Sequence, residues 1–85
     1  MQDKKKNILL ALAKTLKKLR GKKSQFMFSS ENDISISIIS MIERGLKDPQ
    51  LTTLFKLAEA CDIKLSDFIK EIEKDLPKNF SLIEK

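Results

Sequence analysis

The segment that most constrains how this chain folds is ISIISMIERG, residues 36–45. Ser35, just before it, has the side chain that caps a helix start, and Gly45 suits the left-handed conformation that ends many helices. Between them, isoleucines recur at helical spacing: Ile36, Ile38, Ile39 and Ile42. The pattern predicts a short amphipathic helix over residues 35–44.

A second short helix is expected immediately upstream. Ser24 can cap a helix of about two turns that runs to Glu31. Asn32 and Asp33 supply a break after it, because their side chains tolerate a left-handed backbone. Two short helices joined by a tight turn, the second ended by glycine, are the layout of a helix-turn-helix.

Helical spacing continues on both sides of this motif. The first helix carries a leucine stripe: Leu9, Leu12, Leu16 and Leu19. Asp48 is expected to cap a fourth helix, with Pro49 in its first turn. We expect its core face to comprise Leu51, Leu54, Phe55, Leu57 and Ala58, closed by Cys61 as a buried apolar filler.

Ser66 is expected to cap a fifth helix that ends before Pro77. Its apolar residues are Phe68, Ile69, Ile72 and Leu76. The chain is therefore predicted to be all-α, with five helices in one domain over residues 8–76. Residues 1–7 are expected to form a basic arm before a cap at Asn7, and residues 77–85 a tail that docks on the core or on a second subunit.

Composition removes several functions. The chain has no histidine and one cysteine, which excludes imidazole catalysis, a Cys/His metal site and an internal disulfide. No nucleophile and base stand in a recognisable arrangement, so we expect no enzyme activity and no cofactor. The apolar start, residues 8–13, is too short for a secretory signal, and no stretch is long enough to span a membrane. A cytoplasmic location is expected.

Charge is unevenly distributed along the chain. Residues 1–30 hold nine Lys or Arg and one acidic residue, whereas residues 31–85 hold eight basic and eleven acidic residues. The excess of +8 in the first part favours a polyanionic partner near that half. The alternative is a lysine-rich composition without a binding role.

Several motifs together resemble the helix-turn-helix of the phage-repressor and Cro-like family, also called the XRE family. They are Ser24-Gln25, Phe28-Ser29, Asp33-Ile34-Ser35 and ISMIERG, followed by Asp48-Pro49 and LTTLFKLAEACDIKLSDFI. The similarity covers about residues 12–69, and small single-domain repressors and restriction-modification controller proteins share the pattern. It implies a lambda-repressor-like five-helix domain, with the second and third helices as the helix-turn-helix.

The resemblance also implies positions for contacts to double-stranded DNA. The third helix would enter the major groove with base-facing side chains Ile36, Ser37, Ser40 and Met41. Ser35 would lie at the DNA backbone, and Gln25 would touch a phosphate or brace the recognition helix. Arg44 and Lys47 are placed for phosphates on the far side.

The expected base-facing positions are unusual in chemistry. None carries the Arg, Lys, Asn or Gln that most often reads purines. Preference among DNA sequences would then come from contacts to thymine methyl groups, from DNA shape, or from the basic arm in a minor groove. Alternatively, Ile36 and Met41 join Phe26 and Met27, which replace the family's charged residues, in a patch that binds protein.

Two further roles follow from the resemblance and the tail. Arg20 and Glu43 match an ion pair that ties the first helix to the recognition helix in related repressors. A homodimer is expected, with contacts from the fifth helix and the tail: Ile72, Leu76, Phe80, Leu82 and Ile83. The leading hypothesis is a homodimeric DNA-binding transcriptional regulator. Its rival is a protein-interaction module or antitoxin on the same scaffold.

Overall fold

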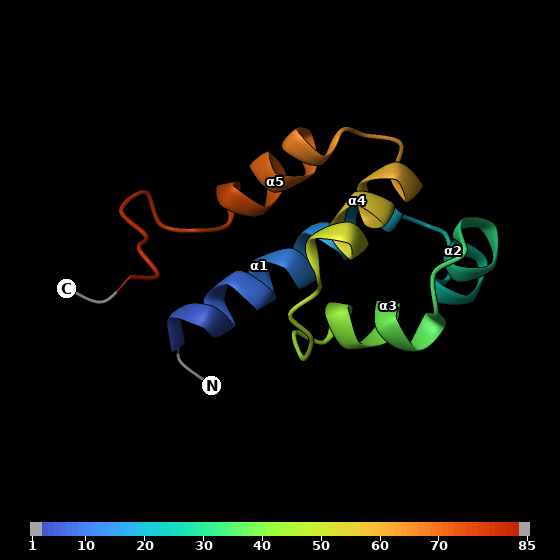
Figure 1. Ribbon diagram of the computed structural model, residues 1–85, viewed down its shortest axis with the longest axis horizontal. Coiled ribbons are helices and arrows are strands. Elements are labelled where there is room, and N and C mark those ends of the chain that lie inside the picture. Colours follow the sequence, from blue (N-terminus) through green and yellow to red (C-terminus); the bar gives the residue numbers. More distant parts are fainter. Residues whose placement is uncertain (1–2, 84–85) are drawn as a thin grey trace.

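The computed structural model describes residues 3–83, which form five helices (Figure 1). They are α1 (Asp3–Arg20), α2 (Gln25–Asn32), α3 (Ile36–Glu43), α4 (Leu51–Ala60) and α5 (Leu65–Lys74). Residues 3–83 contain no strand, and none of the helices within them is long and apolar enough to cross a bilayer. The prediction of an all-α fold with five helices is confirmed.

The long helix α1 is the centre of the molecule. It packs against both α3 and α5, which lie on opposite sides of it in Figure 1. Helix α2 packs against α3 and α4, and α4 against α5. Because α1 is covered on both sides, its leucine stripe becomes the middle of the core.

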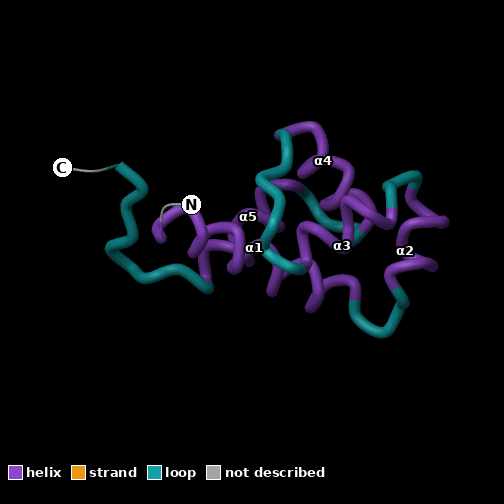
Figure 2. The backbone as a smooth tube through the Cα atoms, turned by 90° about the horizontal axis from the view of Figure 1, so that it is seen from below, coloured by secondary structure: helices purple, strands orange, loops and turns teal. Residues whose placement is uncertain are grey.

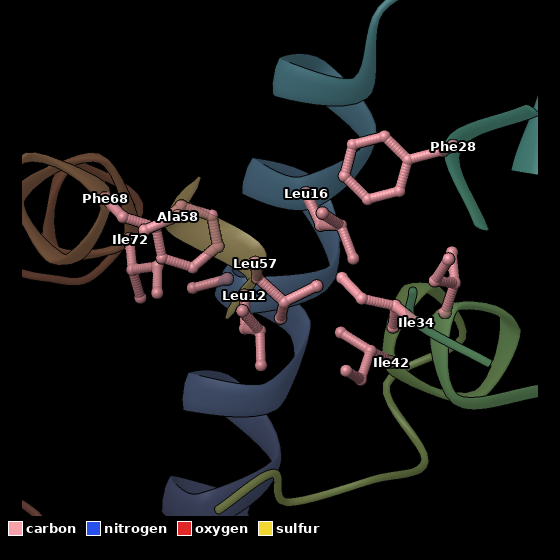
Figure 3. Packing of buried hydrophobic residues seen from close by; sticks show 11 residues of the cluster. Leu12, Leu16, Phe28, Ile34, Ile42, Leu57, Ala58, Phe68 and Ile72 are labelled. Atoms are coloured by element: carbon pink, nitrogen blue, oxygen red, sulfur yellow. The ribbon is translucent and has the colours of Figure 1, made fainter. Parts of the chain in front are cut away.

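One hydrophobic cluster joins all five helices. Figure 3 shows Leu12 and Leu16 of α1 lying between Phe68 of α5 and Ile42 of α3. Leu16, Phe68 and Ile42 have no exposed surface. The remaining members are Ala11, Phe28, Ile34, Ile39, Leu57, Ala58 and Ile72. Since burial of apolar side chains is the main favourable term in folding, this cluster fixes how α3 sits on α1.

The ends of α2 and α3 have the serine caps and left-handed residues that the sequence predicts. The Ser24 hydroxyl accepts a hydrogen bond from the Met27 N–H at 3.1 Å, and the Ser35 hydroxyl accepts one from the Ser37 N–H at 3.2 Å. Asp33, which ends α2, has φ +52°, and Gly45, just after α3, has φ +71°. The two caps and the two left-handed residues set the turn between α2 and α3 and the length of α3.

Gly45→Ala should destabilise the protein by about 1–2 kcal/mol, because a left-handed backbone is unfavourable for L-residues. An added Cβ would also lie 2.9 Å from Cδ2 of Leu10, a side chain exposed enough to swing aside. Gly45→Asn is the matched control, since asparagine adds the same Cβ but tolerates the left-handed region. Urea unfolding should show the smaller loss for asparagine; equal losses would rule out backbone conformation as the cause.

The ends of three helices differ from the predictions. Helix α1 already starts at Asp3, so residues 3–7 are helical rather than a basic arm, and Asn7 does not cap the helix. Lysine has good helix propensity, and an acid in the first turn favours the helix dipole. Residues 1–2 of the expected arm and residues 84–85 of the tail lie outside the described part of the chain.

Helix α4 begins at Leu51 after Gln50, which makes no side-chain cap, so the expected cap at Asp48 and the placement of Pro49 in the first turn were wrong. Asp48 lies in the connector, with its carboxylate 3.5 Å from the Lys5 ammonium.

Helix α5 begins at Leu65 after Lys64, which places Ser66 inside the first turn rather than at the cap. The helix ends at Lys74 with Asp75 as its C-cap, two residues earlier than expected. Leu76 nevertheless packs against the core. The apolar spacing in the sequence therefore continues past the residue at which the helix ends, which is why the predicted end was too late.

The apolar face of α4 is narrower than predicted. Leu57 and Ala58 are buried and Leu54 is half-buried, but Leu51 is 63% and Phe55 53% exposed. Successive helical residues are about 100° apart, so a face centred on Leu54 and Leu57 turns Phe55 away. Cys61, at the C-terminal end of α4, is half-buried against the core, and burial raises the pKa of its thiol to about 11.

Candidate nucleic-acid interface

The outward face of α3 lines a shallow groove of about 420 Å³. Its lining residues are Gln25, Ile36, Ser37, Ser40, Met41 and Arg44. Six of the eight predicted DNA contacts therefore gather at one surface, although they come from two helices and a cap. Ser35 caps α3 at its first turn. Lys47 is half-buried in the connector and does not line the groove.

The opposite face of α3 anchors the helix. Ile39 and Ile42 have no exposed surface, whereas Ile36 is 43% and Met41 39% exposed. Ile38 is half-buried against the core. The helix is thus split lengthwise, with one face fixed in the core and the other available to a ligand.

A buried ion pair ties three helices together behind the groove. Arg20 at the end of α1 donates two hydrogen bonds to Glu43 of α3, from Nε to Oε2 at 2.7 Å and from Nη2 to Oε1 at 2.8 Å. Gln25 of α2 donates from Nε2 to Glu43 Oε1 at 3.0 Å. The Arg20 Nη1 also donates to the Lys23 carbonyl at 2.5 Å. Glu43 is 3% exposed.

Electrostatics keeps both partners of this pair charged. Burial acts to raise the pKa of Glu43, but the hydrogen bonds from Arg20 and Gln25 outweigh it, and the pKa lies below its ordinary value. The hydrogen bond to Glu43 raises the pKa of Arg20. The groove therefore rests on a bidentate charged pair, and the Gln25 amide braces Glu43 in this structure.

Two exposed basic side chains precede α2, at positions that the predicted DNA contacts do not include. Lys22 and Lys23 are exposed in the connector that leads into α2. Lys23 forms an ion pair with Glu31 near the other end of α2. A helix N-terminus and lysine both favour anions, so the local charge at the start of α2 is positive apart from the pair with Glu31.

Exposed apolar side chains also occur on α2. Phe26 is 67% and Met27 46% exposed, while Phe28 of the same helix is buried in the core. Phe26 and Met27 follow Gln25, a groove residue. The α2 and α3 surface therefore combines hydroxyl, cationic and apolar groups.

The expected dimer residues do not form one surface. Ile72 is only 7% exposed and belongs to the core cluster, and Leu76 packs against that cluster. A side chain that fills the core of one chain is not available to a second, so Ile72 is corrected from a contact to a core residue. Phe80 is half-buried, and Leu82 and Ile83 are 46% and 73% exposed on the tail.

The sequence pattern of the family described as Helix-turn-helix matches residues 12–68, which include all of α2, α3 and α4. The chain belongs to this helix-turn-helix family. Family membership and the five helices confirm the predicted resemblance and fold. In this helix-turn-helix protein, α2 and α3 are the two helices of the motif, and the family is one of DNA-binding transcriptional regulators.

Two proteins with regulatory names are similar to this helix-turn-helix chain. Control protein C.MunI from a Mycoplasma species is 33% identical over 72 residues, which cover 81% of this chain and 97% of that protein. Plasmid copy control protein CopR from Streptococcus agalactiae is 44% identical over 50 residues, 59% of this chain. That match spans about half, 54%, of the copy control protein. No solved structure gives a significant match.

Proposed function

We propose that this protein is a transcriptional regulator that binds double-stranded DNA as a homodimer, with α3 in the major groove. The observation that carries the proposal is the lengthwise division of α3: Ile39 and Ile42 are sealed in the core while Ile36, Ser37 and Met41 face outward. The names of both relatives support a control function. The protein would act in the cytoplasm.

The residues on α3 and next to its ends have distinct roles in this proposal. Ser37 and Ser40 would donate to or accept from base edges, and Ile36 and Met41 would contact thymine methyl groups. Ser35, Arg44 and Lys47 would hold phosphates. Because none of the groove side chains on α3 carries a charge or an amide, sequence preference would favour A·T-rich sites and depend on DNA shape.

The homodimer would address two half-sites related by a two-fold axis. Recognition helices in such dimers lie about 34 Å apart, one turn of DNA, so that both enter successive major grooves. The exposed tail residues Leu82 and Ile83 remain candidates for the dimer contact. Cooperative binding of two copies would offset the modest readout of each α3.

Arg44→Ala should weaken binding to all DNA sequences alike and reduce the slope of log affinity against log salt by about one unit, because one phosphate contact is lost. Titration of a labelled duplex at several salt concentrations measures both quantities. Lys70→Ala is the control, since Lys70 is an exposed lysine on α5, on the far side of α1 from α3. An Arg44→Ala slope equal to that of wild type would contradict the phosphate role.

A second function is favoured by the exposure of Phe26 and Met27. In this alternative the α2 and α3 surface holds a protein partner, as an antitoxin or adaptor does, and α3 reads no bases. The two functions separate experimentally: a protein that co-purifies tightly, together with no retention of DNA, supports the alternative. Selection of bound fragments from random DNA supports regulation if an enriched site emerges.

A further inference from the structure

We propose that Met41 is an oxidation site, and that conversion of its thioether to the sulfoxide weakens the binding of α3 to DNA. The inference rests on the proposed function, in which Met41 contacts thymine methyl groups. Met41 lines the groove, and 39% of its surface is exposed. Helix α3 lies below α1 in Figure 1, and Figure 2 views the molecule from that side, with α2 beside α3. A small oxidant in the solvent therefore reaches the side chain when DNA is not bound.

The sulfur groups of the chain differ in how readily they are oxidised. Within residues 3–83 they are Met27, Met41 and Cys61. Cys61 is half-buried, and burial raises the pKa of its thiol to about 11. Because the thiolate is the form of cysteine that attacks oxidants, Cys61 reacts poorly at neutral pH. A thioether has no proton to lose, so the two exposed methionines react without this restriction.

A peroxide is the class of oxidant that acts at this site. The sulfur lone pair attacks one peroxide oxygen, so that an S–O bond forms as the O–O bond breaks. The other oxygen takes up the proton of the transferred oxygen and leaves as water, or as an alcohol from an alkyl hydroperoxide. Sulfur loses two electrons and the peroxide gains them. A methionine sulfoxide reductase that uses a dithiol reverses the change, with a disulfide and water as the products.

The sulfoxide changes the chemistry of the groove at one point. Oxidation converts an apolar side chain into a polar one, which removes the apolar contact with a thymine methyl group. Arg44, the C-cap of α3, follows Met41 by three residues, a spacing at which helical side chains are neighbours, and both line the groove. The sulfoxide oxygen offers Arg44 an acceptor within the protein in place of a DNA phosphate. Both effects lower the affinity for DNA.

Met27 provides an internal comparison. Its side chain lies on α2 with 46% of its surface exposed, but it does not line the groove. Neither Met27 nor Met41 belongs to the hydrophobic core cluster, so oxidation of either should leave the fold intact. Oxidation of Met27 should therefore leave the affinity for DNA unchanged, whereas oxidation of Met41 lowers it.

Treatment of the full chain with hydrogen peroxide tests the proposal. Mass spectrometry of peptides should find one added oxygen on Met41, and the affinity for a duplex with the selected site should fall about five- to tenfold, because one apolar contact is lost. Met41→Leu keeps a similar volume without an oxidisable sulfur, and its affinity should not change on treatment. Met27→Leu is the matched control and should lose affinity as the wild type does. Circular dichroism before and after treatment monitors folding.

Several outcomes would overturn the proposal. They are a Met41 that peroxide leaves unmodified, an oxidised Met41 with unchanged affinity, and a Met41→Leu variant that loses affinity on treatment. Methionine sulfoxide reductase with dithiothreitol should restore the wild-type affinity, and a loss that persists would assign the effect to another modification. Failure of the proposed function is distinguishable: untreated wild-type protein that binds no duplex contradicts regulation itself, whereas binding that peroxide leaves unchanged contradicts only the oxidation site.

Discussion

Arg20→Ala should destabilise the protein by about 3–5 kcal/mol, because it strands the Glu43 carboxylate in the core. The Glu43 side chain is 2% and the Arg20 side chain 17% exposed, and Gln25 alone would remain as a donor. Total stability of a domain is only about 5–15 kcal/mol, so the variant would be marginally folded. Urea denaturation followed by circular dichroism measures the loss.

Two controls separate the stranded charge from other causes. Lys18→Ala removes another α1 cation in an ion pair, with Glu71 at 3.1 Å, but the Lys18 side chain is 69% exposed. Its unfolding midpoint should be nearly that of wild type. Replacing Arg20 with Met and Glu43 with Leu together should recover much of the stability, since apolar pairs often substitute for buried ion pairs. A double variant as unstable as Arg20→Ala would show that packing, not charge, is responsible.

Ile42→Ala should cost about 2–5 kcal/mol, because the residue is fully buried between α3 and α1 and its truncation leaves a cavity. Met41→Ala, one position earlier on the exposed face of α3, should change stability by less than about 1 kcal/mol. Under the proposed function the two substitutions rank the other way in their effect on DNA binding. Met41→Ala alters preference among binding sites, whereas folded Ile42→Ala retains the wild-type preference.

The measurement combines chemical denaturation with binding to a panel of duplexes under conditions where both variants are folded. Equal destabilisation by the two substitutions would mean that α3 is not divided into a core face and a ligand face. Unchanged site preference in Met41→Ala would remove this residue from the base contacts while leaving the fold argument intact.

The sequence by itself determined the local features of the motif. Ser24 and Ser35 cap their helices and Asp33 and Gly45 turn left-handed, because each depends on a side chain and the backbone within a few residues of it. Isoleucine spacing likewise predicted an amphipathic helix, and Ile39 and Ile42 lie on its buried face. The candidate groove followed from the family resemblance, which supplied the positions on α3.

Only the tertiary structure decided what depends on distant segments. It turned Gln25 toward Glu43, buried Ile72 and left Phe55 exposed. Apolar spacing identifies a residue that favours burial, but it does not tell how far a neighbouring helix extends to cover it. The packing of α3 and α5 on opposite sides of α1 leaves one flank of α4 uncovered, and that geometry arises from contacts between residues far apart in the chain.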